Sequence, residues 1–387
     1  MDTAGCGSVS DSVRGYPLRA FVICLIAYTT AQMDLALFGY AVPAIRAEFG
    51  LTLSEVMAIV SSAFLLGGAL LVVLGWLADR MGRLPLFQFS LLGSSFLVAL
   101  ISIASGVATL TALRGASIAV GGLSYPITGA IITEEMPARL RGLFMGLLQI
   151  GYPLGWALAS LWSMWLLTEY GWRQLFWVGL VSLPMVWVVR RYLREPPRSV
   201  VARSTESPPR FPDLFATGVR KRAITLFIAQ FLFVWAYAAS IFLFPSFLRE
   251  VRALDAFNFS LLIGAGNAIG VLGYVFAAWI GERVWTRRNT VVLWTLLGAL
   301  LFQVLVWGPA SFGQILLVYA LMSMFFYGSA AVKFAYLAEV FPTRIRALAM
   351  ACCGSLAVTL GSAAGPYTVS LAIESWGWQL GYATLVG

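Results

Sequence analysis

Residues 76–81 read Trp-Leu-Ala-Asp-Arg-Met, and residues 279–284 read Trp-Ile-Gly-Glu-Arg-Val, 203 positions later. Residues 136–141 read Met-Pro-Ala-Arg-Leu-Arg, and residues 341–346 read Phe-Pro-Thr-Arg-Ile-Arg, 205 positions later. Either pair alone could arise by chance. Two pairs at nearly the same offset indicate an internal duplication. The repeat therefore predicts a fold of two similar halves.

Composition identifies the solvent in which these halves fold. Of the 387 residues, 60% are hydrophobic and 11% are charged, and the mean hydropathy is +0.85. A soluble domain has about a quarter of its residues charged, so an ordinary soluble enzyme, a disordered chain and a disulfide scaffold are excluded. The sequence has no histidine and no Gly-x-x-x-x-Gly-Lys-Ser/Thr loop, which argues against His-ligated metals, Ser-His catalysis and ATP use. We expect a polytopic membrane protein without enzymatic activity, metal or cofactor.

Apolar stretches long enough to cross about 30 Å of hydrocarbon recur along the chain. Eleven are predicted, and a twelfth begins near residue 377 with about half the length that a crossing needs. The fold class that follows is all-α, with six plus six transmembrane helices in two pseudo-symmetric bundles and a truncated twelfth helix. The predicted spans are 19–43, 54–78, 84–104, 107–132, 142–167, 172–193, 222–248, 258–281, 289–307, 313–338 and 346–372.

The longest interruption, 194–221, is rich in proline and arginine, a composition that opposes both membrane insertion and a packed core. It divides the chain into an N-terminal six-helix bundle (1–193), a linker, and a C-terminal bundle (222–387). Alternate loops on the linker side hold 20 of the 26 basic residues, and the opposite loops hold four. The positive-inside rule places the linker and the N-terminus in the cytoplasm. This topology explains the net charge of +9 without nucleic-acid binding, and predicts a multi-pass protein of the inner membrane.

The stretch Gly75-Trp-Leu-Ala-Asp79-Arg80-Met-Gly82-Arg83 resembles the signature loop of the major facilitator superfamily, between its second and third helices. The second copy, 281–288, is degenerate because Trp285 stands where glycine is usual. The resemblance implies secondary transport by alternating access, with a substrate cavity between the halves. Glycines allow close helix approach, and a carboxylate can cap a helix or pair with arginines.

Two interpretations of these loops remain open: a cytoplasmic gate that breaks when the protein opens inward, and a stabilising turn without a gating role. The gate interpretation is preferred. Its predicted residues are Gly75, Asp79, Arg80, Gly82, Arg83, Glu135, Arg139, Arg141, Glu282, Arg283, Glu339, Arg344 and Arg346.

Other stretches are similar to proton symporters for organic acids, the branch that includes sialate, lactate and aromatic-acid carriers. These stretches are 33–43, with Asp34 and Pro43, and the Gln-x-Gly-Tyr pattern of 149–152. Lactate carriers have His, Gln and Asp where this chain has Ala238, Ile241 and Phe242. The departure favours a larger or more apolar acid than lactate, including an aromatic one.

Three charged residues lie inside predicted spans and away from the first and last turn of each span: Asp34, Arg114 and Lys333. Asp34 and Arg114 fall at similar depth, and an unpaired charge in hydrocarbon costs a few kcal/mol, so we expect them to pair across a polar cavity. A carboxyl group removed from water can exchange a proton near physiological pH. Asp34 is therefore the predicted proton-coupling residue, assisted by Arg114; a static salt bridge is the alternative. For Lys333, snorkelling to the headgroups is preferred over contact with a substrate carboxylate.

Polar side chains inside the spans are candidates for binding substrate, although each could instead form an interhelical hydrogen bond. They are Gln32, Tyr125, Gln149, Tyr152, Gln230, Tyr237, Asn267 and Tyr327.

The function predicted from these features is proton-coupled uptake of a small organic acid: a monocarboxylate, an aromatic acid or a sugar acid. The expected partners are an organic anion, protons and the lipid bilayer, without nucleic acid or ATP. Two alternatives stay open, a drug or metabolite/proton antiporter that exports its substrate, and a membrane scaffold that does not transport. Sodium coupling is disfavoured because one carboxylate offers few oxygen ligands.

Overall fold

The computed structural model describes residues 15–81, 83–137, 139–194, 219–308, 311–341 and 349–386. We call 15–194 the N-terminal half and 219–386 the C-terminal half. Most of the predicted linker lies outside the described residues. The described part contains helices and no strands, and eleven of its helical stretches are long and apolar enough to cross a membrane. The predicted all-α polytopic architecture is confirmed.

The N-terminal half begins with two long helices and continues through shorter segments. Its elements are α1 (Tyr16–Phe49), α2 (Leu53–Met81), α3 (Arg83–Leu100), η1 (Ile101–Ile103), α4 (Val107–Gly122), α5 (Ser124–Glu135), α6 (Arg141–Leu148), α7 (Gly151–Glu169), α8 (Trp172–Leu175), η2 (Phe176–Ser182) and α9 (Leu183–Tyr192).

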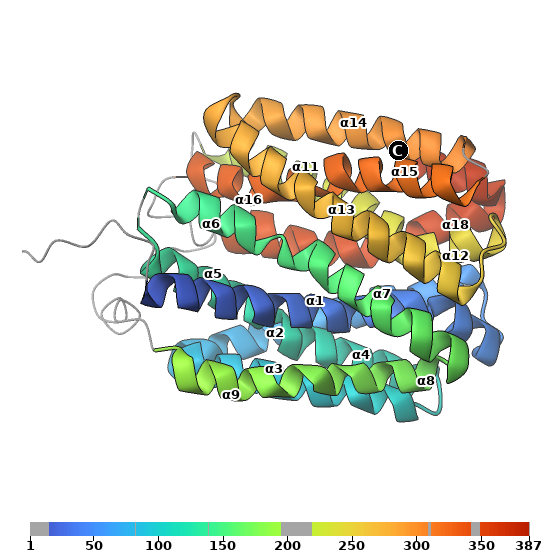
Figure 1. The fold of residues 1–387 in the computed structure, drawn as a ribbon, viewed down its shortest axis with the longest axis horizontal. Coiled ribbons are helices and arrows are strands. Elements are labelled where there is room, and N and C mark those ends of the chain that lie inside the picture. Colours follow the sequence, from blue (N-terminus) through green and yellow to red (C-terminus); the bar gives the residue numbers. More distant parts are fainter. Residues whose placement is uncertain are drawn as a thin grey trace, which may run out of the picture.

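The C-terminal half follows the same plan. Its elements are α11 (Arg220–Phe242), α12 (Phe244–Glu250), α13 (Ala256–Arg283), α14 (Arg287–Trp307), α15 (Phe312–Met322), η4 (Ser323–Tyr327), α16 (Ser329–Val340), η5 (Met350–Leu356) and α18 (Ala357–Val386). In Figure 1 the helices of both halves run roughly along one axis, and the C-terminal half lies above the N-terminal half. Helix α9 ends and helix α11 begins at the left end in this view, which we call the linker end; the opposite end is the far end.

Local sequence explains where the helices start and stop. Asp255 accepts a hydrogen bond from the backbone N–H of Asn258 (2.8 Å) and caps the start of α13. Gly50 ends α1 in the left-handed conformation (φ 64°), which glycine adopts without strain. Caps of this kind satisfy backbone groups that the helix ends leave unpaired.

Some predicted spans are broken where the sequence pattern suggested one continuous helix. The span 142–167 is two helices, α6 and α7, and the break lies at Gln149 and Ile150. Pro153 has no N–H to bond the Gln149 carbonyl four residues earlier, and the carbonyl instead accepts from Tyr152 at 3.0 Å. The predicted start of the last segment near residue 377 coincides with a break inside α18 at Gly377 (φ 81°, ψ 165°).

The two halves pack on each other along two helix pairs, α7 with α13 and α2 with α18. Inside the N-terminal half α1 packs on α7 so closely that a Cβ at Gly155 would lie 2.6 Å from the Cβ of Gln32. Toward the far end, one apolar cluster joins both halves and includes Tyr40, Trp156 and Phe242. This packing leaves an opening between the halves nearer the middle of the helices.

Candidate functional site

A cavity of about 310 Å³ lies between the two halves. The N-terminal half contributes α1, α2, α3, α4, α5 and α7 to its wall, together with Gln149 beside α7, and the C-terminal half contributes α11, α13, α16, η5 and α18. Eight of the residues singled out from the sequence line this cavity: Gln32, Asp34, Arg114, Tyr125, Gln149, Tyr152, Gln230 and Tyr237. The tertiary structure thus gathers residues that are far apart in the sequence around one space.

Asp34 and Arg114 are both at the cavity wall, but they do not form the ion pair that the sequence suggested. The Arg114 guanidinium donates to the backbone carbonyls of Leu35 (Nη2, 2.7 Å) and Asp34 (Nη1, 3.4 Å). Its Cζ atom lies 4.8 Å from the centroid of the Phe38 ring. A carbonyl oxygen has a second lone pair beyond its helical bond, and an aromatic face attracts a cation. The α1 backbone and Phe38 therefore hold Arg114 without help from a carboxylate.

The Asp34 carboxyl group is left without a partner. Asp34 is 4% exposed, and neither Oδ1 nor Oδ2 has a hydrogen-bond donor among the described residues. Arg114 is 2% exposed and forms no ion pair with any described carboxylate. A buried charge without a counter-ion is costly. The site thus holds a carboxyl group and a guanidinium group at one wall, each with unused hydrogen-bonding capacity.

A second polar group of the cavity is fully connected. Gln149 donates from Nε2 to the Tyr125 hydroxyl (2.8 Å) and accepts at Oε1 from the Tyr28 hydroxyl (3.3 Å). The Tyr28 and Tyr125 rings lie 5.4 Å apart, centroid to centroid. Gln32 differs, because its Oε1 is buried and has no donor among the described residues. Gln149 is therefore occupied by the protein, and Gln32 retains an acceptor for another molecule.

Aromatic rings from both halves form the remaining wall. Tyr152 of α7 lies 5.5 Å from Tyr237 of α11, centroid to centroid, and Tyr237 lies 5.6 Å from Phe233. Phe64 of α2 lies 5.9 Å from Phe242 of α11. Sequence reasoning missed Tyr28, Phe64, Phe233 and Phe242, since nothing in an apolar helix marks which of its rings faces a cavity.

Three predicted binding residues, Asn267, Tyr327 and Lys333, are not among the residues that line the cavity. Asn267 donates to the Tyr319 hydroxyl (3.0 Å) and to the Ile263 carbonyl (2.8 Å), and Tyr327 contacts the Ser240 hydroxyl at 3.2 Å. These two residues serve packing between helices of the C-terminal half in this structure.

Lys333 does not take the snorkelling position that the sequence favours for it. Its Nζ atom lies 2.6 Å from the centroid of Phe233, whose ring lines the cavity. The side chain therefore turns toward α11, and it does not extend along α16 to the linker end as snorkelling requires. The attraction of a cation to an aromatic face replaces the headgroup contact.

Several predicted gate residues are placed at the linker end. Arg83 pairs with Glu134, the neighbour of the predicted Glu135, and Arg141 donates to the Met136 carbonyl at 3.1 Å. Glu282 lies 3.5 Å from Arg287. Arg139 and Arg283 are exposed, and Glu135 is half-buried. Gly82, Arg344 and Arg346 lie outside the described residues, as do the side chains at positions 79, 80 and 339, and Gly75 is a helical residue of α2.

The chain is similar to known transport proteins over nearly its whole length. It is 26% identical over 388 residues to the cis,cis-muconate transport protein of Acinetobacter baylyi, covering 95% of this chain and 90% of that protein. It is 24% identical over 406 residues to the gallate transporter of Pseudomonas putida, covering 94% and 89%. It is also 24% identical over 368 residues to the 4-hydroxybenzoate transporter PcaK of Acinetobacter baylyi, covering 85% and 79%.

The fold is likewise similar to a solved structure, a bacterial homologue of the human lysosomal transporter Spinster in an inward-facing and occupied conformation. The TM-score is 0.74 at 16% identity, covering 94% of this chain and 83% of that chain. Residues 24–293 match the Major Facilitator Superfamily, which is more than half of the sequence. By its sequence and its fold, this chain is a member of the Major Facilitator Superfamily of membrane transporters.

Proposed function

We propose that this chain is a proton-coupled importer of a small aromatic or unsaturated organic acid. The observation that carries the proposal is that two groups share one ring-lined cavity without bonding to each other. Arg114 is a cation without a counter-ion, and Asp34 is a carboxyl group without a hydrogen-bond donor among the described residues. An organic anion and a proton are the two species that such a site would take up together.

Arg114 is proposed as the anchor for the substrate carboxylate. A guanidinium has five N–H donors, and the protein backbone takes two of them, at Asp34 and Leu35. The remaining donors suit a carboxylate, which arginine binds in a bidentate manner. Gln32 Oε1, buried and without a donor among the described residues, is positioned to accept from a substrate hydroxyl.

The aromatic wall supports the substrate class. Tyr152, Phe233 and Tyr237 present rings to the cavity, and aromatic pairs favour offset or edge-to-face contacts with a planar ligand. A volume of about 310 Å³ lies at the small end of ligand pockets, which fits a single-ring or short unsaturated acid. Muconate, gallate and 4-hydroxybenzoate, named for the relatives, belong to this class.

The two-half architecture supports a proposal of alternating access. We propose that residues 1–193 and 222–387 form two bundles that rock about the cavity, and that the linker end faces the cytoplasm of a cell with the protein in its inner membrane. The excess of basic residues on that side supports this orientation. Asp34 would bind a proton on one side and release it on the other.

The decisive experiment is uptake into proteoliposomes with and without an imposed pH gradient, using labelled benzoate-type and muconate-type acids. Asp34→Asn should abolish accumulation driven by the gradient and leave exchange of external for internal substrate intact, because the amide keeps the shape of the carboxyl group but cannot carry the proton. Full uphill uptake by Asp34→Asn would exclude this residue as the coupling site.

The same vesicles separate import from the alternative of drug or metabolite export. An importer accumulates the labelled acid inside when the outside is acidic. An antiporter expels the substrate under the gradient that drives proton entry, and a scaffold changes nothing in either direction.

A further inference from the structure

A third short sequence is repeated in the two halves, and both copies lie at the far end. Residues 171–175 read Gly-Trp-Arg-Gln-Leu, and residues 377–380 read Gly-Trp-Gln-Leu. Both glycines have positive φ, 86° at Gly171 and 81° at Gly377. Each turn therefore places a tryptophan at the same point, immediately after the break that precedes the last helical segment described in its half.

Each tryptophan donates its indole N–H to a glutamate at the far end of the first crossing of the same half. Trp172 Nε1 lies 2.6 Å from Oε2 of Glu48, near the end of α1. Trp378 Nε1 lies 3.1 Å from Oε2 of Glu250, the last residue of α12. The two Glu–Trp pairs are thus equivalent features of the duplicated halves.

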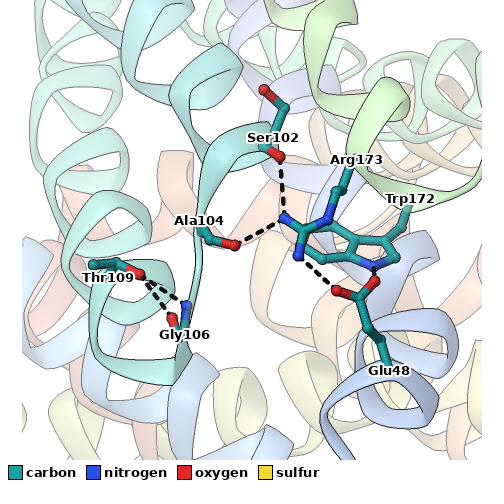
Figure 2. Close-up of polar contacts among 7 residues, drawn as sticks. All are labelled: Glu48, Ser102, Ala104, Gly106, Thr109, Trp172 and Arg173. Carbon is teal, nitrogen blue, oxygen red and sulfur yellow. Dashed lines mark hydrogen bonds and ion pairs between the residues drawn. The ribbon is translucent and has the colours of Figure 1, made fainter.

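The second carboxylate oxygen shows where the halves diverge. In the N-terminal half, Arg173 Nη2 lies 2.5 Å from Glu48 Oε1, and Arg173 Nη1 donates to the carbonyls of Ser102 (3.1 Å) and Ala104 (2.8 Å). Figure 2 shows this cluster, in which Arg173 joins α1 to the turn that follows η1. Every contact of the cluster stays inside the N-terminal half.

In the C-terminal half no arginine follows the tryptophan, because Gln379 stands there. Glu250 Oε1 is paired instead with Arg46 of α1, which belongs to the other half. Arg46 also donates from Nε to the Leu51 carbonyl at 3.1 Å. A second cross-half bond lies beside it, from the Ser54 backbone N–H to Glu374 Oε1 at 2.8 Å.

We propose that the Arg46–Glu250 pair is a latch that holds the two halves together at the far end and opens whenever the cavity opens there, whereas the Glu48–Arg173 pair is a permanent brace within one half. The side chains of Arg46 and Glu250 are 27% and 38% exposed. Ion pairs that water reaches are weak, so this one can break in each transport cycle. The inference rests on the alternating access proposed above.

The test measures how readily the cavity is reached from each end. Ala238 lines the cavity and is small, so Ala238→Cys provides a reporter for a membrane-impermeant maleimide applied to intact cells or to inverted vesicles. Protein without this added cysteine gives the background from the native cysteines. No substrate is required, and the result is therefore independent of the substrate and of proton coupling.

Loss of an exposed ion pair shifts a two-state equilibrium by up to about five-fold. We therefore expect Glu250→Gln and Arg46→Gln to raise the far-side labelling rate by about that factor and to lower the linker-side rate. Glu48→Gln, the matched control, should leave both rates unchanged, because its ion pair is comparably exposed but lies within one half. The double reversal Arg46→Glu with Glu250→Arg should restore wild-type rates.

Outcomes that contradict the latch are equally definite. A wild-type far-side rate in Glu250→Gln overturns it, as does a Glu48→Gln rate as high as that of Glu250→Gln. The latch is also contradicted if the double reversal variant is labelled from the far side as fast as the single variants. A variant that failed to fold would label faster from both sides, which distinguishes unfolding from a shift toward the far-side-open state.

Discussion

The two halves contribute different chemistry to the same cavity. The N-terminal half supplies the charges and most of the hydrogen-bonding groups, Asp34, Arg114 and Gln32 among them. Both halves supply aromatic rings, such as Tyr152 from the N-terminal half and Tyr237 from the C-terminal half, but the described lining residues of the C-terminal half include no charged side chain. Two halves with the same backbone plan can therefore differ in chemistry, because only one of them places charged side chains on the described cavity wall.

Removal of the Arg114 cation tests the contribution of the N-terminal half most directly. Arg114→Gln should raise the KM for acid uptake by about ten- to a hundred-fold, because hydrogen bonds to charged groups contribute about 1.5–3 kcal/mol. Arg114→Lys should be intermediate, since it keeps the charge but loses the fork that matches a carboxylate. Concentration-dependent uptake in proteoliposomes measures both. An unchanged KM in a correctly folded Arg114→Gln variant would show that the anion binds elsewhere.

Removal of a ring tests the C-terminal side. Tyr237→Leu should weaken binding of aromatic acids by about two- to ten-fold, because an aromatic pair contributes about 0.5–1.5 kcal/mol beyond its buried area. Aliphatic acids of similar length should be affected less. Tyr237→Phe is the matched control, which keeps the ring and should retain the preference. Equal losses for aromatic and aliphatic acids would assign Tyr237 a purely structural role.

The smallest expected effect concerns Lys333, the cation behind Phe233. Lys333→Gln should raise the KM for anionic substrates by about two- to five-fold, in keeping with the modest energy of a cation–π contact and the loss of a positive charge near the cavity. Lys333→Arg should be close to wild type. Arg288→Gln removes an exposed charge of the linker end and controls for net charge. An effect of Arg288→Gln as large as that of Lys333→Gln would reduce the role of Lys333 to general electrostatics.

Sequence reasoning succeeded where a property depends on composition or on local spacing. The spans followed from hydrophobic length, and the break at Gly377 was placed near its true position. Sequence reasoning failed where a side chain has several possible bonding partners nearby. Arg114 was paired with the Asp34 carboxylate because both lie at one depth, yet the guanidinium lies against the carbonyls of Asp34 and Leu35. Depth along the membrane does not specify direction around a helix axis when nearly every face is apolar.

The amino-acid sequence is sufficient to identify a helical membrane protein of two similar halves, because a bilayer demands long apolar helices and the repeated loops keep recognisable residues. It also placed Asp34 in the membrane, where an ionisable group is costly enough to be informative. The pairing of Arg46 with Glu250 across the halves, and of Arg173 with Glu48 within one, is seen only once the helices are packed. The physical reason is that an ion pair forms over a few ångströms in space, and helix packing alone decides which distant side chains come that close.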